Sequence, residues 1–104
     1  MRFLDFIVSK QRIERDPVCD FTGIAPGSRG YLYARFRFSA DWNGCKKAVV
    51  FSCRGKDECR PLINGMCEIP AEVLIGSTVG VAVVGERDGY RITTNKISFQ
   101  QRRV

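Results

Sequence analysis

Apolar and polar residues alternate along most of this sequence, and this alternation is the feature that most restricts the fold. Successive side chains of a β-strand point to opposite faces, so each face receives every second residue. In the segment 31–38 the apolar residues share one face: Leu32, Ala34, Phe36 and Phe38. The aromatic and basic residues share the other: Tyr31, Tyr33, Arg35 and Arg37. Helical periodicity is almost absent, so the pattern predicts an all-β protein whose strands bury one face.

The same alternation predicts four further apolar strands: Phe3–Val8, Lys47–Cys53, Thr78–Val84 and Ile92–Phe99. The segment Lys47–Cys53 has apolar residues on both faces, so we expect both of its sides to be covered. Along Ile92–Phe99 the alternation slips by one residue, which predicts a bulge near Asn95.

Two dipeptides favour the tight turns of β-hairpins, Asn64-Gly65 and Asp88-Gly89, and we expect a hairpin at each. One short helical turn is predicted near residues 70–75, because Pro70 suits the first helical position and Gly76 follows soon after. The segment 16–30 is rich in Gly, Pro, Ser and Asp, so it is predicted to be a long loop.

Seven or so short strands with frequent turns predict one antiparallel β-sandwich over residues 1–104, with a small closed barrel as the alternative. The length fits a single domain. We expect nine residues to form its structural core: Phe36, Phe38, Trp42, Phe51, Ile69, Pro70, Leu74, Val81 and Val83.

The composition argues against an enzyme. The chain has no histidine, which removes the commonest general base and the commonest neutral metal ligand. A Ser-His-Asp or Cys-His mechanism within the chain is therefore excluded. No glycine-rich phosphate loop follows a predicted strand, so we expect neither catalysis nor a cofactor. No apolar run approaches the roughly 18 residues of a membrane-spanning helix, so we expect no membrane partner.

Five cysteines are present: Cys19, Cys45, Cys53, Cys59 and Cys67. None of their spacings is the C-x-x-C pair that structural zinc sites ordinarily use, so no metal site is predicted. Most of them lie in predicted strands, where a cysteine is usually a small buried apolar residue. The alternative is one disulfide between Cys53 and Cys59, which a tight bend between them would allow.

The predicted outer face of segment 31–38 is the candidate contact face: Tyr31, Tyr33, Arg35 and Arg37. Aromatic and basic side chains on a strand can stack on bases and meet phosphates, and the formal charge of +6 favours anionic partners in general. They are equally suited to a protein contact. The order of residues does not match the RNA-binding strand motif, so we expect any nucleic-acid binding to be nonspecific. A third interpretation is carbohydrate binding, with Tyr31, Tyr33 or Tyr90 stacking on sugar rings.

Several ordered motifs resemble a known family. The run Phe36-Arg37-Phe38-Ser39-Ala40-Asp41-Trp42-Asn43-Gly44, followed by Lys47-Ala48-Val49-Val50-Phe51, is similar to an F-x-F-(x)-x-D-W-x-G…K-x-x-x-F signature. Segment 67–74 matches C-x-I-P-x-E-V-L, and segments 81–85 and 92–95 match a valine strand closing on glycine and an I-T-T-N stretch. Over residues 30–100 the chain resembles the N-terminal immunoglobulin-like domain of upper baseplate or tail proteins of phages and prophages of Gram-positive bacteria.

The resemblance implies a non-enzymatic virion domain, a baseplate or tail component that acts through protein contacts. Its expected partners are other virion or tail proteins, or a second copy of itself. The expected localisation is the virion, after synthesis in the bacterial cytoplasm. Residues 1–8 are not typical of a secretion signal, because an aspartate interrupts a short apolar run.

Overall fold

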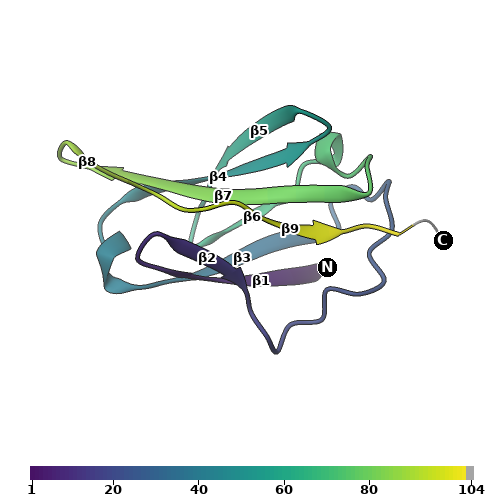
Figure 1. The fold of residues 1–104 in the computed structure, drawn as a ribbon, viewed down its shortest axis with the longest axis horizontal. Coiled ribbons are helices and arrows are strands. Elements are labelled where there is room, and N and C mark those ends of the chain that lie inside the picture. The colour runs from purple at the N-terminus through teal and green to yellow at the C-terminus, as the bar shows by residue number, and fades with distance from the viewer. Residues whose placement is uncertain (103–104) are drawn as a thin grey trace.

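The computed structural model describes residues 1–102, which form two β-sheets packed on each other (Figure 1). The first sheet has the strand order β2-β1-β3-β6, and the second has the order β5-β4-β7-β8, with β9 also paired to β7. The strands are β1 (Arg2–Ser9), β2 (Arg12–Arg15), β3 (Leu32–Phe38), β4 (Lys46–Cys53), β5 (Lys56–Pro61), β6 (Met66–Glu68), β7 (Thr78–Arg87), β8 (Tyr90–Thr93) and β9 (Ile97–Gln100). This is a sandwich-like all-β domain, as predicted, and the closed-barrel alternative is wrong.

The short connections contain 3-10 turns, at Ala40–Trp42 and Ala71–Val73. The second is the predicted helical turn: it follows Pro70, and it places Val73 and Leu74 in the core. None of the helical segments within residues 1–102 is long and apolar enough to cross a membrane.

The first sheet is not fully antiparallel, and in this respect the sequence-based prediction is wrong. A tight turn at Lys10 returns the chain as β2, which pairs antiparallel to one edge of β1. The other edge of β1 pairs with β3 in parallel, from Arg2 opposite Leu32 to Val8 opposite Phe38. Parallel neighbours need a long crossover, and the predicted loop between β2 and β3 supplies it.

The predicted strand Ile92–Phe99 is divided into β8 and β9, and the predicted bulge lies between them. Val84 pairs with Thr93, whereas Val81 pairs with Ile97. Three residues around Asn95 therefore face two residues of β7. Across this bulge the Val83 N–H donates to the Thr94 hydroxyl (3.0 Å) instead of to a main-chain carbonyl. The Asp88-Gly89 hairpin between β7 and β8 is confirmed.

Asn64-Gly65 does form a tight turn, with both residues at positive φ, but it does not join two paired strands. Beyond one bridge between Ile63 and Met66, β5 pairs with β4 in the second sheet and β6 pairs with β3 in the first. The turn therefore carries the chain from one sheet to the other, and the predicted hairpin is confirmed only as this two-residue turn with its single antiparallel bridge.

The predicted core is confirmed for eight of its nine residues. Phe36, Trp42, Phe51, Ile69, Pro70, Leu74, Val81 and Val83 are buried. Phe38 is only half-buried, because it lies at the last position of β3, where the strand leaves the sheet. The centres of the Phe38 and Trp42 rings are 5.2 Å apart, and the Lys47 ammonium lies over the Phe38 ring.

One side of the sandwich is joined by a seam, which we define as Gln11, Ile13, Thr93 and Asn95. The Asn95 side chain accepts a hydrogen bond from the Ile13 N–H (2.9 Å) and donates to the Ile13 carbonyl (3.4 Å). The Asn95 N–H donates to the Gln11 carbonyl, and the Gln11 amide donates to the Thr93 carbonyl. The asparagine thus pairs with edge strand β2 as a neighbouring strand would.

The opposite side, between β5 and β6, is open. Every second residue of β5 lies opposite a core residue of β4 and therefore points toward the first sheet. These residues are Lys56, Glu58 and Arg60, opposite Cys53, Phe51 and Val49. Arg60 forms ion pairs with Glu58 and Glu72, and it borders a groove of about 770 Å³. Inward-pointing charges and the terminal Pro61 protect this edge from pairing with another chain.

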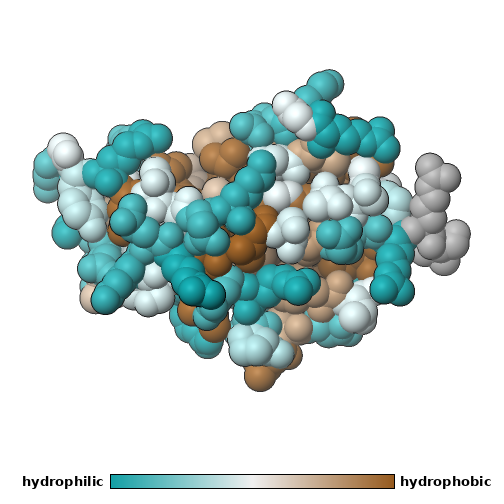
Figure 2. Space-filling model, in the orientation of Figure 1, coloured by the Kyte–Doolittle hydropathy of each residue, from teal (hydrophilic) through white to brown (hydrophobic). Residues whose placement is uncertain are grey.

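The surface in the orientation of Figure 1 is mainly hydrophilic, with hydrophobic areas near the middle of the view (Figure 2). The loop between β2 and β3 projects at the bottom of this view and carries hydrophobic surface at its tip. Val18 in this loop is 91% exposed.

Candidate interaction face

The outer surface of the first sheet gathers the predicted contact residues and further residues from β1 and β6. Register places Phe3 beside Tyr33, Asp5 beside Arg35, and Ile7 beside Arg37, with Met66 on the far side of Arg35. We call the following residues the contact face: Phe3, Ile7, Tyr31, Tyr33, Arg35, Arg37 and Met66. Tyr31 lies just before β3 and is 49% exposed, and Tyr33 is half-buried against Phe3.

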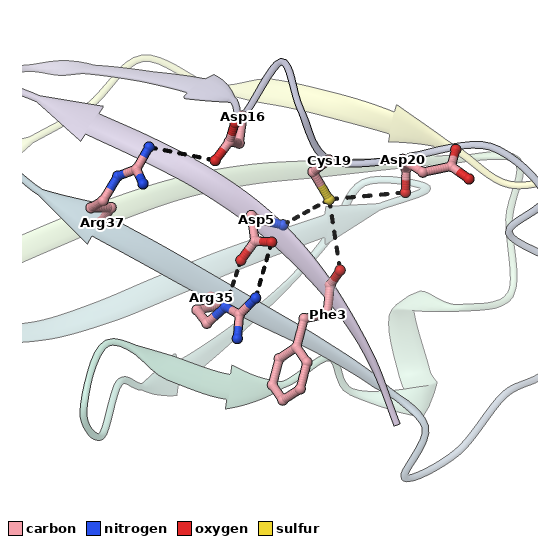
Figure 3. A network of polar contacts seen from close by, with 7 residues as sticks. All are labelled: Phe3, Asp5, Asp16, Cys19, Asp20, Arg35 and Arg37. Atoms are coloured by element: carbon pink, nitrogen blue, oxygen red, sulfur yellow. Dashed lines mark hydrogen bonds and ion pairs between the residues drawn. The ribbon is translucent and has the colours of Figure 1, made fainter.

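Arg35 is held in place by two neighbours on β1. Its Nε and Nη2 donate to the two carboxylate oxygens of Asp5 at 2.6 and 3.2 Å (Figure 3). Its guanidinium also lies over the Phe3 ring, 4.4 Å from the ring centre. The hydrogen bonds that Arg35 donates to Asp5 raise the pKa of its guanidinium, which is charged. Paired and stacked in this way, Arg35 presents a fixed rather than a mobile charge.

The chain after β2 is tied to the same strand through Cys19. The Asp5 N–H donates to the Cys19 sulfur (3.3 Å), which also lies near the carbonyls of Phe3 and Asp20 (Figure 3). Asp16 follows β2 and forms an ion pair with Arg37 (3.5 Å). Hydrogen bonds from Thr22 lower the pKa of Asp20. The start of the β2–β3 loop is thereby fixed beside the contact face.

This arrangement suits a protein partner better than a nucleic acid. Tyr, Phe, Met and Arg are enriched at protein interfaces, and all four types are present here. Nucleic-acid surfaces instead need cations free to neutralise phosphates and bases stacked on open rings. On the contact face both arginines already contact carboxylates, and Tyr33 packs against Phe3.

The structure does not gather the three tyrosines that were considered for sugar binding. Tyr31 and Tyr33 lie at the start of β3 in the first sheet, whereas Tyr90 begins β8 in the second. The Tyr90 hydroxyl donates to the Asp41 carbonyl, which follows the opposite end of β3. Tyr90 is therefore not part of one aromatic platform with the other two.

The five cysteines are free in the structure. The Cys53–Cys59 disulfide considered from the sequence is not formed, because the two side chains point to opposite faces. Cys53 is buried in the core, whereas Cys59 is opposite the outward-facing Val50 and is exposed. Within residues 1–102 no three His, Cys, Asp or Glu side chains come together as a metal site would require.

The thiols should therefore differ in reactivity while contributing no cross-link. Burial raises the pKa of the Cys67 thiol to about 11, which leaves little reactive thiolate at pH 8. We expect Cys59 to be alkylated fastest in the native protein, and all five thiols to react after denaturation. Chelator and reductant should leave the melting temperature unchanged. A loss of two protons in the intact mass, or stoichiometric zinc, would contradict this expectation.

Sequence reasoning identified the tyrosines and arginines of this face but missed Asp5, the acidic residue that pairs with Arg35. Asp5 interrupts the apolar segment Phe3–Val8, which was the available signal that it points outward. Its pairing with Arg35 depends on the parallel register of β1 and β3, which no local pattern reveals.

The chain was also compared with known proteins. No family model, curated protein or solved structure matches it.

Proposed function

We propose that this protein is a non-enzymatic structural domain that acts by protein–protein contact through the contact face. The observation that carries the proposal is the fixed array of Arg35, Phe3 and Asp5, beside Tyr33 and Met66. A preorganised arginine stacked on an aromatic ring loses little conformational entropy when a partner docks. The acidic neighbours make the face a mixed surface, which favours a protein with both signs of charge.

The finer proposal is an immunoglobulin-like domain of a phage or prophage baseplate or tail, with other virion proteins as partners. The resemblance of residues 30–100 to such domains supports it, and the motif residues Trp42, Ile69, Pro70 and Leu74 are core residues, as fold-determining positions should be. In this proposal the chain is made in the bacterial cytoplasm and is then incorporated into particles.

Incorporation into particles tests this proposal. A tagged copy would be expressed in the organism that encodes the chain, particles would be induced and purified, and the tag would be quantified in them. We expect stoichiometric incorporation of the parent chain and at least a tenfold loss for the double variant Tyr33→Ala, Arg35→Glu. Arg87→Glu, at the exposed end of β7 in the other sheet, is the matched control and should be incorporated normally. Absence of the parent chain from particles would contradict the virion role.

Nucleic-acid binding is the competing outcome, because of the formal charge of +6. We expect weak oligonucleotide binding that disappears at about 0.2 M salt, since scattered cations act only by counterion release. Mobility-shift measurements over a salt series check this. Submicromolar binding that persists at that salt and falls on Tyr33→Ala would favour nucleic acid instead.

A further inference from the structure

The two central strands of the second sheet, β4 and β7, are apolar on both faces. Their inward residues Val49, Phe51, Val81 and Val83 are buried in the core. Their outward residues Ala48, Val50, Ala82 and Val84 remain partly exposed, and within residues 1–102 the other sheet covers only the inward face. Strands with continuous apolar runs are usually covered on both faces, as was predicted for Lys47–Cys53. Within residues 1–102 no element covers the outward side.

This outer surface is smooth and uncharged at its centre. One row across the sheet is Pro61, Ala48, Val84 and Thr93, and the next is Cys59, Val50 and Ala82. These side chains are short, so another sheet can approach to the roughly 10 Å at which sheets stack. We call these seven residues the outer β4–β7 face.

Charged residues border this face at both of its ends. One end carries Lys46 beside Glu86, which in turn pairs with Arg91. The other end carries Asp57, and there the Lys96 side chain lies over Gly80. Three cations and two carboxylates leave the border close to neutral, unlike the chain as a whole. A strongly acidic partner therefore gains little here.

We propose that the outer β4–β7 face binds a second copy of this chain, with β4 of each copy lying over β7 of the other. A two-fold axis parallel to the strands produces this arrangement. It places Lys46 opposite Glu86 of the second copy, and Asp57 toward the strand edge that carries Lys96. It also places Ala48 opposite Val84 and Val50 opposite Ala82, so that a small side chain always meets a larger one. The face is therefore self-complementary in charge and in shape.

The size of the face sets the strength of this contact. The face is four strands wide, at about 4.8 Å per strand, and about seven residues long, at about 3.4 Å per residue, so it covers about 500 Å². A standard stable interface buries about 800 Å² per partner. The dimer should therefore be reversible and should form at high protein concentration, as neighbouring copies in an assembly experience. This inference does not depend on the contact face of the first sheet or on the virion role.

Sedimentation velocity on the full chain tests the proposal. Measurements from about 10 µM to about 1 mM span the affinities expected of a weak interface. A reductant is included because Cys59 is exposed on this face. We expect the average mass to rise from 11.7 kDa toward twice that value. Val50→Lys should weaken association at least tenfold, and Val18→Lys in the exposed β2–β3 loop, the matched control, should not. Val50→Ser replaces the lysine variant if thermal melting shows that the latter is unfolded.

A charge exchange tests the arrangement itself. Lys46→Glu should weaken association, because it places two carboxylates opposite each other, and the double variant K46E/E86K should restore it to within about threefold of the parent. In the alternative arrangement, β4 of one copy lies over β4 of the other, and Lys46 faces the end of the second copy that carries Asp57. The double variant would then associate more weakly than either single variant. A chain that stays monomeric at every concentration, or an unchanged Val50→Lys variant, would overturn the proposal.

Discussion

Trp42→Ala should lower the free energy of unfolding by about 3–5 kcal/mol, which is the usual cost of truncating a large buried aromatic residue. Trp42 is fully buried, its Nε1 donates to the Lys10 carbonyl (2.8 Å), and its ring packs on Phe38. Truncation leaves a cavity that is not easily filled, because the neighbour that packs directly on the ring is Gly85, which has no side chain. A Cβ at Gly85 would lie only 2.9 Å from the Trp42 ring. Such a loss is a large part of a typical domain stability of about 5–15 kcal/mol.

Chemical denaturation of the two proteins measures this difference. Trp42→Phe serves as the comparison, because it keeps a buried aromatic ring while it removes the hydrogen bond to Lys10 and part of the indole. Its loss should be clearly smaller than that of the alanine variant. If Trp42→Ala unfolds at the same denaturant concentration as the parent, the tryptophan does not hold this end of the sandwich together.

Asn95→Ala should destabilise the protein by about 1–3 kcal/mol, the usual cost of leaving a part-buried polar group without its partner. The substitution removes both hydrogen bonds between the Asn95 side chain and the Ile13 main chain. Ile13 is itself buried, so its N–H has little access to water as a replacement.

Aspartate at the same position distinguishes the contributions of the two hydrogen bonds to stability. Asn95→Asp retains an acceptor for the Ile13 N–H and removes only the longer donor contact. Its loss of stability should therefore lie between those of the parent and the alanine variant. Ser98→Ala, an exposed change on β9, should alter stability by less than about 0.5 kcal/mol. Equal melting temperatures for Asn95→Ala and Ser98→Ala would show that the seam does not contribute.

Alternation predicted the strands that bury a face, because the core selects every second residue. It identified β3, β4 and β7, together with the inward residues Phe36, Phe51 and Val81. The turns at Asp88-Gly89 and Asn64-Gly65 were also recognisable, because glycine and asparagine readily adopt positive φ.

The alternation pattern did not predict β2 and β5, which are held in their sheets mainly by main-chain hydrogen bonds. Only Ile13 in β2 is buried, and four of the six residues of β5 are charged, so neither strand carries an apolar stripe. Their turns were equally hard to recognise, since Lys10 and Arg54 adopt positive φ without being typical turn residues. The parallel pairing of β1 with β3, and with it the Asp5–Arg35 pair, is a property of tertiary topology.

The seam has a consequence for how the protein folds. It joins Ile13 to Asn95, which lie 82 residues apart in the sequence. Contacts of such separation carry a large loop-closure cost and make folding slow. During synthesis, edge strand β2 therefore has no cross-sheet neighbour until β8 and the bulge have left the ribosome. Until then the early strands are an incomplete sheet with an unprotected edge, which is the stage at which this protein is most prone to aggregate.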